Sequence, residues 1–124
     1  MDQKHATRMR RRQAFTLVEL LVVVAIIGIL AAIAIPQFSA YRAQGFNARA
    51  SSDLRNLATA EEAYFAANAS YASNLSALTG FKQSPGVVIT VVPGATSFTA
   101  QASHANGNKT FDWDSANGGL QNAP

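Results

Sequence analysis

Glu19 is the single charged residue in a largely apolar run of 21 residues from Phe15 to Ile35. The last 16 residues of this run carry no polar side chain. A carboxylate at the centre of a membrane helix costs roughly 2.5–3.5 kcal/mol, so such a group usually has a function and a partner. The run contains no basic side chain. Glu19 therefore either reaches the headgroup region near its end of the run or finds a cation outside it.

The sequence contains no motif that is typical of an enzyme. The two histidines, His5 and His104, belong to no cluster, and the sequence has no glycine-rich phosphate loop, nucleophile elbow or HExxH motif. Asp112 and Asp114 are a weak calcium candidate, because their spacing differs by one from an EF-hand loop and the terminal acidic residue is missing. We expect solvated turn carboxylates there, no cofactor and no catalytic residues.

The composition fits neither a disordered chain nor an ordinary soluble domain. Its 124 residues allow one domain; 48% are hydrophobic, only 14% are charged, and none is cysteine, which excludes disulfides and thiolate metal sites. The net charge is +3, but residues 1–14 carry five basic and one acidic side chain, or +4, which leaves −1 for the remainder. The basic character therefore belongs to the start of the chain and indicates no nucleic-acid site on the folded part.

The apolar run has the length of a membrane helix. At a rise of ~1.5 Å per residue it spans ~31 Å, close to the ~30 Å of a hydrocarbon core. The basic residues before it predict a cytoplasmic N-terminus and an exported C-terminal part. A cleaved secretory signal peptide is disfavoured, because Pro36 and Gln37 follow the run where a small-x-small site would be expected.

Residues 14–36, AFTLVELLVVVAIIGILAAIAIP, resemble the class III leader junction and N-terminal helix of type IV pilins and related pseudopilins. Residues 37–57 are similar to pilins of electron-exporting bacteria. The resemblance implies that a prepilin peptidase cuts between Ala14 and Phe15 and that the new amine of Phe15 is methylated. The family usually has Gly where this chain has Ala14, and many members carry a C-terminal cysteine pair that this chain lacks.

The resemblance also implies a partner for Glu19. In the family this glutamate is thought to pair with the N-terminal amine of a neighbouring subunit, here the amine of Phe15. Pairing with the amine of its own chain, one helical turn away, is the alternative. The family further implies a helix hinge between Gly28 and Pro36, where a simple proline kink is equally compatible with the sequence.

Downstream of Pro36 the sequence predicts an amphipathic helix to residue 67, in one rod of 53 residues and about 80 Å with the apolar run. Charged residues such as Asp53 and Glu61 lie mostly between its apolar positions. The apolar stripe, which the rest of the chain must cover, comprises Phe38, Tyr41, Phe46, Ala50, Leu54, Leu57 and Tyr64.

Residues 68–124 predict a small antiparallel sheet. A short helical turn is expected around Leu75 and Leu78, and strands over 87–92, 97–103 and 109–113, with a tail after Gly118-Gly119. The expected fold is α+β: a long N-terminal helix packed on a three- to four-stranded antiparallel sheet. The expected divisions are a cleaved basic leader (1–14), a transmembrane and polymerisation helix (15–36), an amphipathic helix (37–67) and a loop and sheet region (68–124).

The favoured function is that of a major pilin, which starts in the inner membrane and polymerises into an extracellular type IV pilus for adhesion, twitching motility or DNA uptake. The alternatives are a major pseudopilin of type II secretion in a periplasmic pseudopilus and a monomeric membrane-anchored binding module. Expected partners are further copies of the chain and, through the resemblance, prepilin peptidase/N-methyltransferase, an assembly ATPase and platform proteins. Phe38, Tyr41 and Phe46 are expected interface aromatics; electron transfer along them is a weaker hypothesis.

Overall fold

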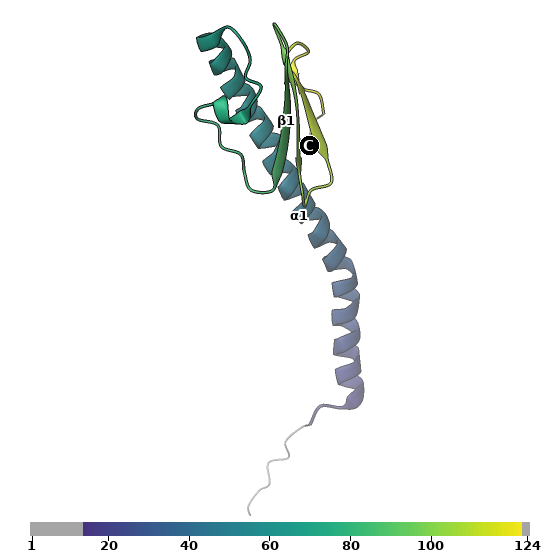
Figure 1. The fold of residues 1–124 in the computed structure, drawn as a ribbon. Coiled ribbons are helices and arrows are strands. Elements are labelled where there is room, and N and C mark those ends of the chain that lie inside the picture. Colours follow the sequence, from purple (N-terminus) through teal and green to yellow (C-terminus); the bar gives the residue numbers. More distant parts are fainter. Residues whose placement is uncertain (1–13, 123–124) are drawn as a thin grey trace, which may run out of the picture. The chain divides into compact units, whose positions relative to one another are not determined.

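The computed structural model describes residues 14–122. It contains one long helix and a four-stranded antiparallel sheet, which confirms the expected α+β fold (Figure 1). The chain divides after Pro36 into two units, which we call the N-terminal segment (up to Pro36) and the head (from Gln37 onward). The elements are α1 (Leu17–Asn68), a 3-10 helix (Leu75–Ala77), β1 (Val87–Pro93), β2 (Phe98–His104), β3 (Thr110–Asp114) and β4 (Gly119–Leu120).

The part of α1 in the N-terminal segment forms a continuous helix. Its first turn begins at Leu17, and the helical assignment passes without a break through Gly28 and Pro36. Proline removes only one backbone donor, and the rest of the turn still pairs internally. Helical backbone pairing suits this apolar sequence, because the side chains from Leu20 to Ile35 have no polar group that could pair with the backbone.

The sheet is a meander in which each strand pairs with the next along the chain, in the order β1-β2-β3-β4 (Figure 1). The pairing β1–β2 extends from Val87 opposite His104 to Pro93 opposite Phe98. Pro93 can end β1 because proline is tolerated at a strand terminus on a sheet edge. Gly94 follows it, and its N–H donates to the carbonyl oxygen of Ser97 at 2.7 Å to close the turn.

The end of the chain differs from the sequence expectation. Residues after Gly118 were expected to form a tail, but Gly119–Leu120 is a fourth strand that pairs with Trp113 and Asp114 of β3. Gly118 and Gly119 have φ angles of 88° and 93°. Only glycine adopts this region readily, so the pair reverses the chain tightly enough to return it to β3.

The core of the head lies between α1 and the inner face of the sheet. Leu54 and Leu57 of α1 are fully buried, and Phe98 and Phe111 oppose them from β2 and β3 in the same apolar cluster. The inner face follows the two-residue period of a strand, as the alternating burial of β2 shows. The expectation that the sheet covers the second half of the helix is therefore correct at these positions.

The apolar stripe is covered over only part of its length. Phe38 and Tyr41 remain 64% and 65% exposed, so the expectation that the chain's own sheet covers them is wrong. Asp53 and Glu61, which were expected among the polar positions, are buried. In both cases the contacts depend on where the sheet and its loops reach along α1, which helical periodicity does not specify.

Candidate assembly surface

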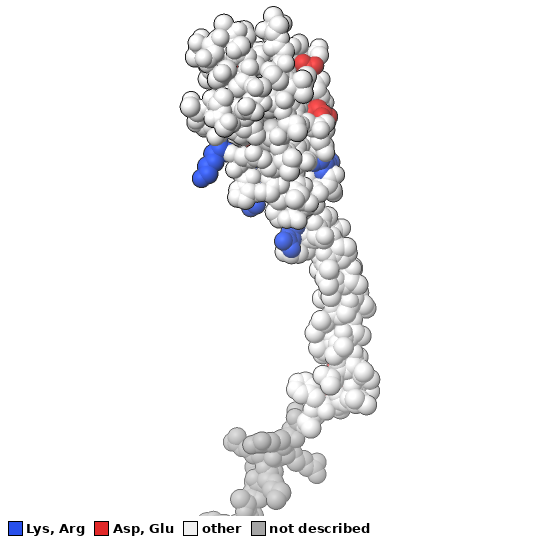
Figure 2. Space-filling model, viewed as in Figure 1, with Lys and Arg blue, Asp and Glu red and all other residues white. Residues whose placement is uncertain are grey.

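The N-terminal segment presents an apolar surface with one carboxylate at its start. The large apolar side chains from Leu17 to Ile35 are between 51% and 73% exposed. An 18-residue window of α1 has a mean hydropathy of 3.0 and no buried residue. The space-filling view shows almost no charge along this segment (Figure 2). An exposed apolar surface of this extent requires lipid or protein around it.

Glu19 is held in a capping box at the start of α1. Its backbone N–H donates to Oγ1 of Thr16 at 3.2 Å, and its Oε2 accepts from the backbone N–H of Thr16 at 3.2 Å. The two contacts satisfy two of the free donors at a helix N-terminus, where the dipole also favours a negative charge. The carboxylate is thereby directed towards the residue next to Phe15, rather than along the apolar helix.

The expected processing residues lie immediately before the helix. Ala14 and Phe15 precede the first turn and are exposed, Phe15 at 87%. The backbone between them is therefore accessible. The rest of the expected leader, residues 1–13, lies outside the described residues. Ala14 is therefore the part of the leader that the structure describes.

The expected interface aromatics differ in their surroundings. Phe46 stacks on His104 of β2 with ring centroids 4.3 Å apart, and the guanidinium carbons of Arg42 and Arg49 lie 6.0 and 5.4 Å from its ring centre. Phe46 therefore joins α1 to the sheet. Phe38 and Tyr41 are exposed on the head, and Arg42 lies over the ring of Phe38 with its guanidinium carbon 6.0 Å from the ring centre.

Asn47 ties the β2–β3 turn to α1. Its Oδ1 accepts from the backbone N–H groups of Asn108 (3.0 Å) and Lys109 (3.2 Å), and its Nδ2 donates to Oδ1 of Asn108 at 2.6 Å. One side chain thus satisfies two backbone donors 61 and 62 residues away. A buried side chain with three such contacts positions the turn, since each lost contact would leave an unsatisfied polar group.

Two buried carboxylates tie the connection between α1 and β1. Asp53 accepts from both the backbone N–H of Ser84 (2.7 Å) and its Oγ (2.8 Å). Glu61 is fully buried; its Oε2 accepts from the backbone N–H of Ala72 at 2.9 Å, and its Oε1 has no hydrogen-bond partner within the described residues. Burial raises the pKa of Glu61 above the ordinary value, and the charge of Glu62 adds to this.

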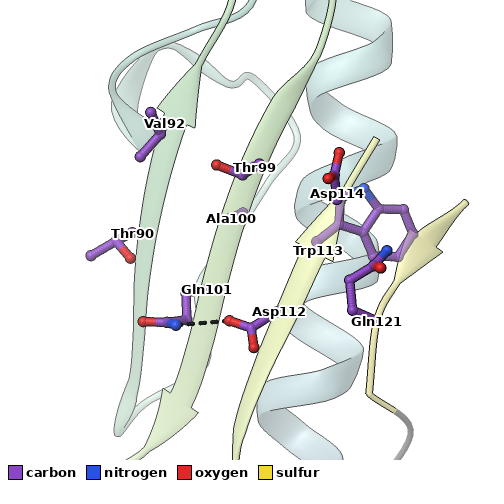
Figure 3. A pocket seen from close by; sticks show the side chains of 9 residues that line it. All are labelled: Thr90, Val92, Thr99, Ala100, Gln101, Asp112, Trp113, Asp114 and Gln121. Atoms are coloured by element: carbon purple, nitrogen blue, oxygen red, sulfur yellow. Dashed lines mark hydrogen bonds between the residues drawn. The ribbon is translucent and has the colours of Figure 1, made fainter. Parts of the chain in front are cut away.

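The outer face of the sheet holds a shallow polar depression of about 400 Å³ (Figure 3). Gln101 Nε2 donates to Oδ1 of Asp112 at 2.7 Å across its floor. Asp114 closes the next turn by accepting from the backbone N–H of Ala116 (3.0 Å) and from Nδ2 of Asn117 (2.6 Å). Both carboxylates of the calcium candidate therefore have protein donors, and residues 14–122 contain no cluster of three or more metal-ligating side chains. The expectation of solvated turn carboxylates at Asp112 and Asp114, with calcium as the weaker alternative, stays untested.

Sequence reasoning missed Thr16 and the three buried polar anchors of α1. The spacing Thr-x-x-Glu directly before an apolar run is the signature of a capping box, so Thr16 could have been found. Asn47, Asp53 and Glu61 have no local signature, because their partners come from distant parts of the chain.

Comparison with known proteins agrees with these features. Residues 9–35 match the family model described as the prokaryotic N-terminal methylation motif. A type IV wide pilus major component of Thermus thermophilus is 38% identical over 107 residues, which cover 83% of this chain and 82% of the relative. A type IV major pilin protein of Myxococcus xanthus is 51% identical over 55 residues, 44% of this chain and 25% of the relative. A fimbrial protein of Pseudomonas aeruginosa is 56% identical over 54 residues, 44% of this chain and 35% of the relative. The chain thus spans most of the first relative but only a quarter and a third of the other two.

Proposed function

Because the chain belongs to the type IV pilin family, we propose that it is the major subunit of an extracellular type IV pilus and polymerises through its N-terminal segment. The family consists of structural subunits, so the protein is not an enzyme. The precursor resides in the inner membrane with residues 15–36 across it, and the assembled form lies on the cell surface.

The exposed apolar surface of the N-terminal segment carries this proposal. Its large side chains are all more than half exposed, which is stable only in lipid or against other copies. A monomeric anchored module would use the lipid alone and would give Glu19 no cation from a second chain. Packing against further copies covers the same surface outside the membrane and supplies that cation.

Glu19 is proposed to select the register of assembly. Cleavage between Ala14 and Phe15 creates an ammonium group, and an unpaired carboxylate in a low dielectric is costly. The capping box already directs the Glu19 carboxylate to the backbone next to Phe15. The amine of an incoming subunit or of its own chain then completes the ion pair, and only the first of these pairs links two subunits.

Substitution of Glu19 tests the proposal. We expect Glu19→Ala precursor to enter the membrane and to be cleaved, but to yield no filaments on the cell surface. Immunoblots of sheared and membrane fractions measure both forms, and Asn56→Ala, which truncates an exposed polar side chain of the head, is the control and should assemble. Normal filaments from Glu19→Ala would contradict the pairing role.

The residue before the cut is expected to affect processing. Ala14 is small enough for a peptidase that normally meets glycine, so the mature N-terminus is proposed to be N-methylated Phe15. Mass spectrometry of purified filaments tests whether the subunit has the mass of a chain that begins with N-methylated Phe15. Ala14→Gly is expected to shorten the lifetime of the uncleaved precursor, as measured by pulse-chase.

The helix between Gly28 and Pro36 is proposed to open on assembly. It is fully helical in the isolated chain, but Pro36 weakens the ladder of backbone bonds at its end. Pro36→Ala would strengthen that ladder, and its filaments should show greater helicity by circular dichroism if the segment unwinds in the wild type.

The proposed uses of the filament are attachment, twitching motility and DNA uptake, driven by an assembly ATPase and platform proteins. Surface spreading and transformation assays of a deletion strain separate these uses. Electron transfer would require aromatic contacts between copies; equal filament conductance after Phe38→Leu and Tyr41→Leu would remove that role. Calcium-dependent stability of the head at Asp112 and Asp114 would instead favour a secretion pseudopilus.

A further inference from the structure

We propose that the head is electrostatically polar, with a basic and an acidic end, and that the basic end of one copy docks on the acidic end of a second copy in the same orientation. This inference rests on the proposed filament. It adds a contact between the heads of neighbouring copies to the contact between their N-terminal helices. The head carries five basic and five acidic residues from position 37 onward, so its formal charge is zero. Figure 2 shows Lys and Arg gathered at one end of the head and Asp and Glu towards the other.

The basic end is formed where β2 turns into β3. Asn47 binds the backbone of Asn108 and Lys109, so this turn lies against the part of α1 that carries Arg42 and Arg49. The side chains of Arg42, Arg49 and Lys109 are exposed. Three cations from two distant parts of the sequence are thereby brought to one end of the head.

A fourth cation reaches the same end. The backbone N–H of Ala105, directly after β2, donates to the carbonyl oxygen of Gly86 at 2.9 Å. This bond holds the loop before β1 beside the β2–β3 turn, and the loop carries the exposed side chain of Lys82. The basic end therefore consists of Arg42, Arg49, Lys82 and Lys109.

The acidic end is formed at the opposite end of the strands. Asp114, at the end of β3, lies opposite Thr99 near the start of β2. Glu62 lines a groove together with Gly118 of the β3–β4 turn, which places it at this end as well; Arg55 lines the same groove and is the one cation beside these carboxylates among the described residues. Asp112 lies two residues before Asp114 on the same strand and the same face. Glu62 and Asp112 are exposed.

The arginines are held without losing their charge. The guanidinium groups of Arg42 and Arg49 lie over the ring of Phe46, which is itself stacked on His104. An aromatic face attracts a cation through its quadrupole but does not cancel its charge. The two guanidinium groups are thus ordered and still available to carboxylates of another molecule.

Charge polarity selects between the two ways in which identical heads can meet. A two-fold contact brings the same patch of each copy together, so basic would face basic or acidic would face acidic. A head-to-tail contact in an open helical array brings unlike ends together. Opposite charges favour the second arrangement and like charges penalise the first, and these effects act on specificity and on the rate of docking.

The experiment uses the full chain in piliated cells and three variants. The basic-end variant is Arg42→Glu, Arg49→Glu and Lys82→Glu, which leaves one positive and three negative charges at that end, and the acidic-end variant is Glu62→Lys with Asp112→Lys. Arg55→Glu is the control, because it changes the charge in the same direction at an exposed position of α1 outside the basic end, and beside Glu62 it leaves the acidic end acidic. Circular dichroism of each purified protein verifies that the head remains folded.

Each end variant alone is expected to lower the yield of sheared filaments roughly tenfold, whereas Arg55→Glu stays within about twofold of wild type. Coexpression of the two end variants is expected to restore the yield to within about threefold of wild type, because a head with two acidic ends can alternate with one that has two basic ends. Undiminished filaments from either end variant would overturn the proposal.

Two further outcomes would also overturn it. One is folded end variants that fail even when coexpressed. The other is degradation or failed cleavage of the basic-end precursor, which would place the loss of filaments before the heads can dock. Absence of filaments from the wild-type chain would instead refute the proposed pilus function itself, so the two failures are distinguishable.

Discussion

The two halves of α1 share one backbone conformation but differ in how their apolar side chains are covered. Before Pro36 the apolar side chains surround the helix and are more than half exposed. After Pro36 the apolar side chains follow one face, and Leu54 and Leu57 are fully covered by the chain's own sheet. The polar residues also differ, since Glu19 caps the helix start whereas Glu61 is buried in the head.

This difference shows that the head is complete within one chain and the N-terminal segment is not. The head encloses a core from α1, β2 and β3 and satisfies most of its buried polar groups internally. Within residues 14–122 no side chain buries the apolar surface of the N-terminal segment, so its stability depends on lipid or on further copies. Stability of the head and assembly of the filament should therefore respond to different substitutions.

The largest expected effect comes from separating the sheet from α1. A fragment of residues 37–124 is expected to fold as a soluble monomer, whereas residues 69–124 alone are expected to be largely unfolded, since so small a region loses half of its core. The near-ultraviolet circular dichroism of Trp113 reports folding in both fragments. A folded 69–124 fragment would show that the sheet does not need the helix.

A matched pair of leucine substitutions compares the two halves directly. Leu54→Ala in the fully buried position should lower the free energy of unfolding of the head by about 2–5 kcal/mol, because it leaves a cavity. Leu30→Ala in the 60% exposed position should leave the unfolding of the head unchanged and reduce filament yield instead. Denaturant unfolding in detergent measures the first effect, and equal losses in both variants would contradict the division.

Loss of a polar anchor should have a smaller effect. Asn47→Ala leaves the backbone N–H groups of Asn108 and Lys109 without their acceptor and is expected to cost about 1–3 kcal/mol. Asn56→Ala, at an exposed position of the same helix, is the control and should change stability by less than about 0.5 kcal/mol. Equal stabilities of these two variants would remove the anchoring role.

The smallest expected effect depends on pH. Burial raises the pKa of Glu61 in the folded head, so folding favours its protonated form. The contribution of Glu61 to stability is then complete below the ordinary carboxyl pKa and declines as pH rises through the raised pKa, with a slope of at most about 1.4 kcal/mol per pH unit. Glu61→Gln, which resembles the protonated form, should remove this decline and exceed the wild type in stability near neutral pH. A stability difference between Glu61→Gln and the wild type that does not change with pH would contradict this prediction.

The sequence predicted the elements of the fold better than their contacts. Length and the continuous apolar run identified the first half of α1, and the valine-rich run with Pro93-Gly94 identified β1, because these are local signals. The fourth strand was missed, since two residues carry too little pattern to distinguish a strand from a tail. Phe38 and Tyr41 were expected to be covered, but helical periodicity gives the face of a side chain and not the reach of the sheet.

The polar part of the site was predictable only where its partners are close in the sequence. The Thr16–Glu19 capping box spans three residues and follows a known spacing, whereas Asn47 and Asp53 are paired with residues 61 and 31 positions away. Such pairs follow from tertiary contacts alone. Glu61 would have been assigned to solvent by any local rule, and only the path of the loop through Ala72 accounts for its burial.

Thiol accessibility in assembled material tests most directly whether copies of the chain cover the N-terminal segment. The chain has no cysteine, so Ile29→Cys introduces a single thiol at a position that is 63% exposed in one chain. Sheared filaments in detergent-free buffer should protect this thiol from a water-soluble maleimide, and full labelling should occur only after denaturation. A thiol that reacts in intact filaments as fast as in denatured protein would contradict the account.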